Sequence, residues 1–144
     1  MESIEAILSS ASIRTALGLA WRESQPGTPA RHEEGGFIVR DAAGTIRVIR
    51  WPRGQGNAIE VPPHPGCKAD GLEIIASFHT HPNTGPDYLQ ELSETDKRAV
   101  RADRDLRASH YCGELVISAD LLYLISPEGG VSELGETQRT LTPA

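Results

Sequence analysis

The sequence predicts a mixed α/β domain (α+β class) in which a curved, mainly antiparallel sheet is flanked by two main helices. Two observations support this class. Apolar residues recur at helical spacing near the N-terminus and follow strand-like patterns in short segments farther on. Turn-forming Gly, Pro, Asn and Asp separate those segments, and a charged amphipathic segment interrupts them. No glycine-rich phosphate loop joins a strand to a helix, so nucleotide binding is not indicated.

Helices are expected from Ser3 to Trp21 and over 94–108, because apolar residues recur there every three or four positions. The expected strands are 36–40, 45–51, 72–79, 114–118, 121–126 and 130–134, with at most one further short strand at 58–61. A chain of 144 residues suits one ordinary core, so we expect a single domain over 1–144. Its polar end, 136–144, is expected to form a flexible tail.

The net charge of −6 argues against a nucleic-acid partner, since such surfaces are usually basic. No apolar run reaches transmembrane length, so no membrane partner is expected either. Glu2 and Glu5 stand where a signal peptide carries positive charge. We therefore expect a cytoplasmic mature chain, or one delivered by a route without a cleaved signal. The oligomeric state stays open.

Cys67 and Cys112 are the only cysteines, and they do not form the close CxxC pair of a zinc finger. We expect two reduced, partly buried thiols. A disulfide between them is the alternative if the protein ends up outside the cell.

The motif His79-Thr80-His81-Pro82 follows residues 75–78, which are apolar or small and are expected to end a buried strand. Alternate side chains of a strand point to the same face, so His79 and His81 are expected side by side. Pro82 has no N–H to donate and ends the strand ladder. Two imidazoles at a strand end suit one metal ion, although each alone is also compatible with a histidine bonded to the backbone.

Ser93 and Asp96 are expected at the start of the second helix, with Ser93 as the N-cap and Asp96 in the first turn. This pair also fits a simple capping box. The cap would nevertheless fix the Asp96 carboxylate, which a metal site requires. Two histidines, one aspartate and an open fourth position form a catalytic type of zinc shell.

Glu33 and Glu34 precede the first strand segment, Gly36 to Arg40, upstream of the two motifs. A glutamate before a small-residue-rich strand, then His-[Ser/Thr]-His-Pro, then Ser-x-x-Asp resembles the JAMM signature of the JAB/MPN metalloproteases. The pattern is most similar to the JAB-like domains of bacterial polymorphic-toxin and effector proteins. The resemblance covers the chain from Glu33 to the last strands, and it implies a JAB/MPN-like (cytidine-deaminase-like) fold.

By this resemblance, His79, His81 and Asp96 would ligate Zn²⁺, Glu33 would be the general acid/base and Ser93 would help to hold the oxyanion. Zinc lowers the pKa of a bound water to about 7 and polarises the substrate carbonyl. The implied activity is that of a zinc metallopeptidase or isopeptidase. Its substrate would be a protein or peptide, including a ubiquitin-like or conjugated protein.

The pattern departs from the family in one respect: Asp96 lies 15 positions after His81, which is longer than usual. The extra residues fall in 83–92, and a loop tolerates such an insertion. Strand alternation sends Glu33 and Glu34 to opposite faces, so only one can reach the metal, and the spacing to Gly36 favours Glu33.

Two other function classes remain alternatives. One is an MPN-like binding or scaffold module without catalysis, and the other is a RadC-like role on DNA, which the acidic charge disfavours. The complete set of motif residues favours the enzyme. His32, His64 and His110 receive no role, because most histidines lie on the surface or are satisfied within the core.

Overall fold

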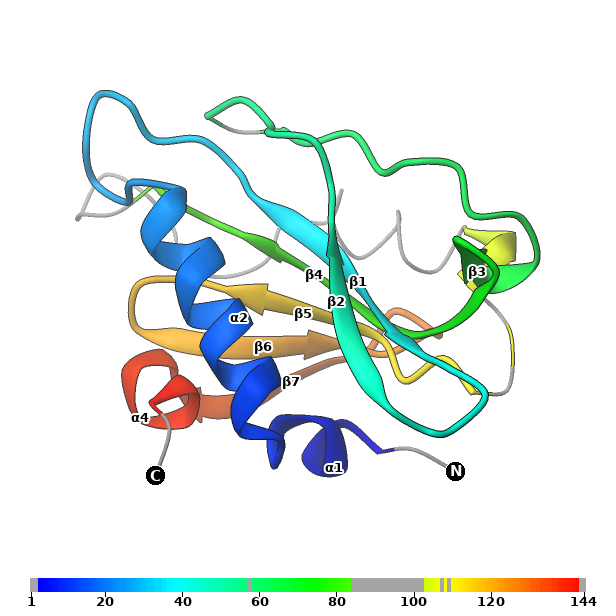
Figure 1. Ribbon diagram of the computed structural model, residues 1–144. Helices are drawn as coiled ribbons and strands as arrows, with labels where there is room; N and C mark the ends of the chain where they lie inside the picture. The colour runs from blue at the N-terminus through cyan, green and yellow to red at the C-terminus, as the bar shows by residue number, and fades with distance from the viewer. Residues whose placement is uncertain (1–2, 57, 84–102, 107, 109, 143–144) are drawn as a thin grey trace.

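The computed structural model describes residues 3–56, 58–83, 103–106, 108 and 110–142. They form a seven-stranded sheet of order β2-β1-β4-β5-β6-β7, with β3 paired to β4 outside this path (Figure 1). The strands are β1 Gly35–Arg40, β2 Ile46–Arg50, β3 Lys68–Ala69, β4 Leu72–Thr80, β5 Glu114–Ile117, β6 Leu121–Ile125 and β7 Val131–Glu136. Only β4 and β5 are parallel among these pairs. The mixed α/β class with a mainly antiparallel sheet is thus confirmed.

The N-terminal segment forms two helices, α1 Ile4–Leu8 and α2 Ala11–Glu23, where one was expected. Serine side chains compete with a helix for its own backbone groups. The Ser9 hydroxyl donates to the carbonyl of Ala6 (2.6 Å), and α1 ends there. Arg14 then joins the two helices by donating to the Leu8 carbonyl (2.8 Å).

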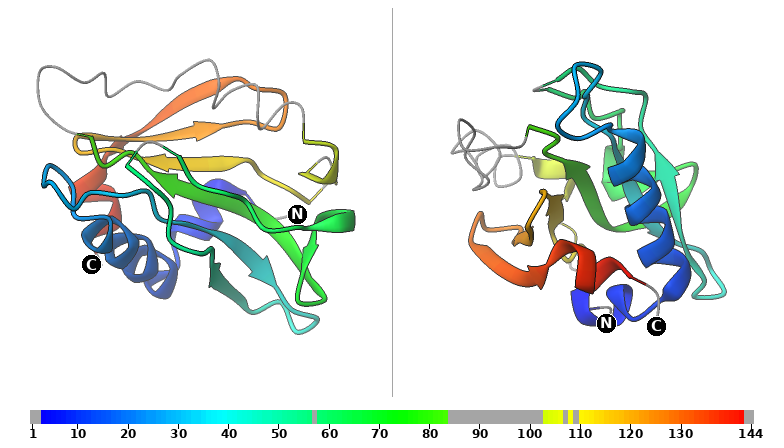
Figure 2. Two further views of the ribbon diagram at one scale, coloured as in Figure 1. Left: turned by 90° about the horizontal axis from the view of Figure 1, so that it is seen from above. Right: turned by 90° about the vertical axis from the view of Figure 1, so that its left-hand side faces the viewer.

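Helices α1, α2 and α4 (Thr137–Leu141) contribute to one apolar cluster on one face of the sheet, which we call the helix-side cluster. A second cluster on the other face contains Trp51, Leu106 from the 3₁₀ turn η2 (Arg104–Leu106), and Tyr111. In Figure 2, α2 and η2 accordingly lie on opposite sides of β4. Ser77 and Phe78, neighbours on β4, face opposite clusters, so the histidine after Phe78 faces the second one.

Residues 136–142 carry regular structure up to the end of a helix, whereas a flexible tail was expected over 136–144; 143 and 144 lie outside the described residues. Strand β7 runs to Glu136, and α4 follows it directly. Thr137 holds the start of α4 by donating its hydroxyl to the Ser118 carbonyl (2.8 Å), and Leu141 is buried in the helix-side cluster. Leu141 is the one large apolar residue of the segment 136–144, so the polar composition of that segment did not indicate this packing.

Other differences lie around the long excursion between β2 and β4. The short strand expected at 58–61 does not form in the residues that are described there. An unexpected hairpin joins β3 to β4 instead, and its turn is Asp70-Gly71, both with positive φ (51° and 76°). An Asp-Gly pair of this kind is a strong hairpin signal. The 3₁₀ turn η1, Pro65–Cys67, precedes β3.

The helix expected over 94–108 falls largely outside the described residues. The structure describes 103–106 and 108 of it, and these carry the 3₁₀ turn η2 in place of α-helix. The Asp103 carboxylate accepts from the backbone N–H of Asp105 (3.0 Å), which favours a tight turn there.

None of the described helices is long and apolar enough to cross a membrane.

Cys67 and Cys112 are both free thiols, in line with the expected reduced state and not with the disulfide given as the alternative. Cys67 is buried in the second cluster and Cys112 packs against the helix-side cluster, so the sheet separates them. Burial raises the pKa of the Cys67 thiol to about 11, which keeps it protonated.

Candidate metal centre

His79 and His81 lie side by side at the end of β4. Their ring centroids are 5.0 Å apart, with an angle of 54° between the ring planes. His79 is only 5% exposed, whereas His81 is half-buried. The backbone N–H of His81 donates to the carbonyl of Ile117 (2.8 Å), so the parallel pairing with β5 still holds the chain beyond the last residue of β4. The adjacent imidazoles are therefore carried by backbone that is still paired with β5.

Ser93 and Asp96, the expected oxyanion residue and third zinc ligand, lie outside the described residues. Their roles stay predictions.

The register of β1 on β4 decides which glutamate faces the histidines. Gly35 lies directly opposite His79, and directly opposite residues share one face of the sheet. The backbone of Glu33 continues this extended geometry, since its N–H donates to Gln55 (2.6 Å) and its carbonyl accepts from Gly54 (2.9 Å). Strand alternation then places Glu33 on the histidine face. Its side chain is buried, at 7% residue exposure.

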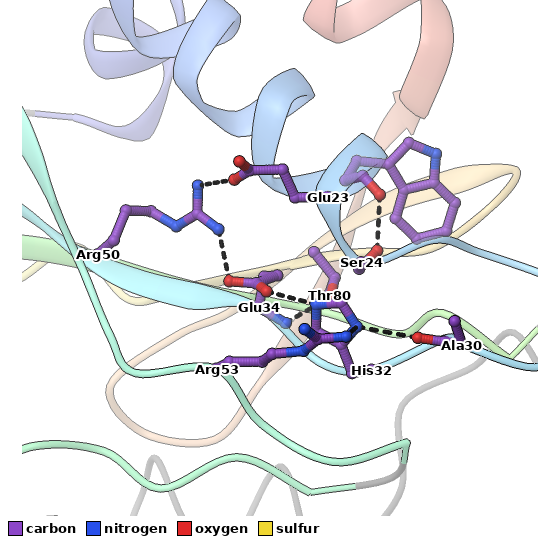
Figure 3. Close-up of polar contacts among 9 residues, drawn as sticks. Glu23, Ser24, Ala30, His32, Glu34, Arg50, Arg53 and Thr80 are labelled. Carbon is purple, nitrogen blue, oxygen red and sulfur yellow. Dashed lines mark hydrogen bonds and ion pairs between the residues drawn. The ribbon is translucent and has the colours of Figure 1, made fainter.

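Glu34 lies on the helix side of the sheet, with its carboxylate engaged by two neighbours (Figure 3). One carboxylate oxygen is 2.5 Å from a guanidinium nitrogen of Arg50, and the other is 2.5 Å from Nε2 of His32. Arg50 also donates to Glu23 on α2 (2.7 Å). The Glu34 N–H donates to the Thr80 hydroxyl (3.0 Å). Glu34 therefore ties β1 to β2 and α2, and His32, left without a role by the sequence, belongs to this structural network.

A buried acid that sequence reasoning missed contacts the first histidine. Oε2 of Glu114, the first residue of β5, lies 2.9 Å from Nδ1 of His79. Its Oε1 accepts from the Ser77 hydroxyl (2.9 Å), and that hydroxyl is 2.7 Å from the hydroxyl of Tyr111. The available signal was an acid at the start of an otherwise apolar strand.

A second group of potential ligands, His64, Asp103 and Asp105, has donor atoms within 4.8 Å of one another. Nδ1 of His64 is 2.7 Å from the Pro62 carbonyl, and its Nε2 is 2.8 Å from Asp103. Burial lowers the pKa of His64, but the hydrogen bonds to Pro62 and Asp103 outweigh burial and raise it. Both ring nitrogens of His64 are thus hydrogen-bonded, and the group connects the long segment between β2 and β3 to η2.

Compared with the His64 group, the pair on β4 offers two imidazoles in place of one, and imidazole is a common ligand of zinc. Glu114 engages Nδ1 of His79, so Nε2 is the ring nitrogen that would ligate a metal. Two imidazoles with a carboxylate behind one of them are a frequent arrangement in zinc sites.

No protein-family model, curated protein or solved structure matches the chain. The JAMM resemblance therefore depends on the sequence pattern alone.

Proposed function

We propose that this protein is a zinc-dependent metallopeptidase of the JAMM type, which hydrolyses a peptide or isopeptide bond in a protein or peptide substrate. The observation that carries the proposal is the meeting, at one end of the sheet, of side-by-side imidazoles and a buried glutamate on the same face. Ubiquitin-like or conjugated proteins fit this reaction class. We retain a cytoplasmic location as part of the proposal.

In this proposal His79 and His81, with Asp96, hold the ion. A bound zinc ion supplies Lewis acidity and lowers the pKa of a water to about 7. Neutral imidazole is the form that ligates, so each histidine must present an unprotonated nitrogen. The end of β4 suits this task, because its backbone stays paired with β5 and carries the two rings side by side.

Glu33 is the proton carrier in the proposal. It takes a proton from the attacking water, whose oxygen bonds to the carbonyl carbon, and it delivers a proton to the nitrogen that leaves when the C–N bond breaks. Glu34 does not suit this role, since Arg50 and His32 engage its carboxylate on the opposite side of the sheet. Ser93 would donate a hydrogen bond to the oxyanion that develops on the carbonyl oxygen.

The first experiment measures zinc content by mass spectrometry of the purified protein after loading and desalting. We expect one zinc per chain in wild type and loss of zinc in His79→Ala, His81→Ala and Asp96→Ala. His64→Ala is the matched control, because it removes a histidine from the other group of potential ligands. Zinc lost in His64→Ala and retained in the His79 and His81 variants would place the ion at the other group and overturn the proposal.

The second experiment separates an enzyme from a scaffold. Zinc-loaded wild type is incubated with a panel of peptide and isopeptide conjugates, and cleavage is followed by mass. We expect cleavage that a chelator abolishes and added zinc restores. Zinc binding with no cleavage of any conjugate, together with stable binding of a partner protein that Glu33→Gln does not alter, would favour the scaffold alternative.

A further inference from the structure

Glu114 occupies an unusual place for a carboxylate. It is 8% exposed at the start of β5, where the parallel register puts Ser77 of β4 directly beside it. A cavity of about 70 Å³ next to these two residues is lined by the apolar Phe37, Trp51 and Leu106 and also by Asp103. A buried carboxylate is costly unless its oxygens are hydrogen-bonded, so its partners explain why it is tolerated.

The donors around Glu114 form a directed chain. A carboxylate only accepts, so the Ser77 hydroxyl must donate to Oε1, across 2.9 Å. Ser77 has a single proton, so Tyr111 donates to the Ser77 oxygen across 2.7 Å. Burial, together with the charge of Glu114, raises the pKa of Tyr111 well above its ordinary value, which keeps this donor protonated. The chain leaves Oε2 as the acceptor for Nδ1–H of His79, across 2.9 Å.

We propose that Glu114 is a positioning residue of the metal centre: with Ser77 and Tyr111 behind it, it holds the proton of His79 on Nδ1 and presents Nε2 to the ion. The inference depends on the proposed function, because it assigns His79 as a metal ligand. A carboxylate hydrogen-bonded to a ligating histidine fixes its tautomer and ring orientation and increases its basicity. Burial strengthens this effect, since the side chains of His79 and Glu114 are only 7% and 11% exposed.

A purely structural role for Glu114 makes a different prediction. In that case its replacement lowers stability and leaves metal affinity unchanged. The Glu34 carboxylate provides the comparison: it is equally buried, at 8% residue exposure, and also contacts a buried histidine, but it lies on the other side of the sheet. The two glutamates therefore allow a matched test.

The test measures zinc affinity by competition with a chelator of known affinity, for wild type, Glu114→Gln and Glu34→Gln. Glutamine keeps the size of the side chain and an acceptor oxygen but removes the charge. We expect Glu114→Gln to weaken zinc binding by about 10- to 100-fold, and Glu34→Gln to leave it unchanged. Tyr111→Phe, which removes only the far end of the chain, should weaken binding less than Glu114→Gln. Unchanged zinc affinity in folded Glu114→Gln would overturn the proposal.

A second readout does not require metal. Nitrogen-15 NMR of the His79 ring in the metal-free protein reports which nitrogen carries a proton. We expect a protonated Nδ1 in wild type and a mixture of tautomers in Glu114→Gln. An unprotonated Nδ1 in wild type would overturn the inference even if zinc binds. If wild type binds no zinc while the ring behaves as expected, the proposed function fails and the contact between Glu114 and His79 still stands.

Discussion

Gly35 lies directly opposite His79 in the antiparallel pairing of β1 with β4. This single register relationship assigns Glu33 to the histidine face and Glu34 to the helix face. A shift of the pairing by one residue would exchange the two glutamates. The candidate centre is therefore defined as much by the pairing of β1 as by the histidine motif itself.

The first prediction concerns Glu33. Glu33→Gln keeps the size of the side chain but cannot accept a proton, so turnover of a cleaved conjugate should fall by about 10²–10⁴-fold. Zinc content and melting temperature should stay close to wild type, because the proposed role of Glu33 is proton transfer and not ligation. Full activity in this variant, with activity lost in Glu34→Gln, would show that Glu34 is the base after all.

The second prediction concerns the structural role of Glu34. Glu34→Gln removes the charged partner of the buried His32 and one of the two carboxylates paired with Arg50, so urea denaturation should show a loss of about 1–3 kcal/mol. Glu73→Gln is the matched control, because the Glu73 side chain, paired with Arg40 (2.9 Å), is 44% exposed against 10% for Glu34, so its pair should contribute less. Equal losses in the two variants would contradict the network.

The third prediction concerns the close contact between Gly35 and Trp51. A Cβ added at Gly35 would lie 2.5 Å from a carbon of the Trp51 ring and 2.7 Å from the Phe78 carbonyl. Gly35→Ala should therefore destabilise the protein by about 1–3 kcal/mol and alter its tryptophan fluorescence. Gly18→Ala is the control: its Cβ would meet only the end of Arg22, at 3.9 Å, in the middle of α2. That change should stabilise the protein by about 0.5–1 kcal/mol.

The fourth prediction concerns pH and His64. The pKa of His64 is raised above its ordinary value of 6.5 in the folded state, so protonation favours folding. The stabilisation is complete below pH 6.5 and is lost as the pH rises through the raised pKa. Melting curves of wild type and His64→Gln should therefore differ most at mildly acidic pH and converge on the alkaline side. A difference independent of pH would show that the hydrogen bond to Asp103 acts without the charge.

Much of the fold follows from local pattern. The apolar run that becomes β4, the hairpin of β1 and β2 and the closing strands β5 to β7 were each expected within a few residues of their bounds. Asp41 illustrates why: its carboxylate accepts from the N–H groups of Ala43 and Thr45, so the hairpin turn depends on residues at most four positions apart. Such signals are contained in a short stretch of chain.

The sequence by itself determined the histidine pair, because alternation along one strand is enough to put His79 and His81 on one face. Only the tertiary structure decided that Glu114 contacts His79, that Glu34 belongs to the helix side, and that α4 is anchored by Leu141. Each of these contacts joins segments distant in the sequence; Glu114 and His79, for example, are 35 positions apart. They depend on which strands pair and in what register, and the pairing is settled by burial of the whole sheet, which no local periodicity encodes.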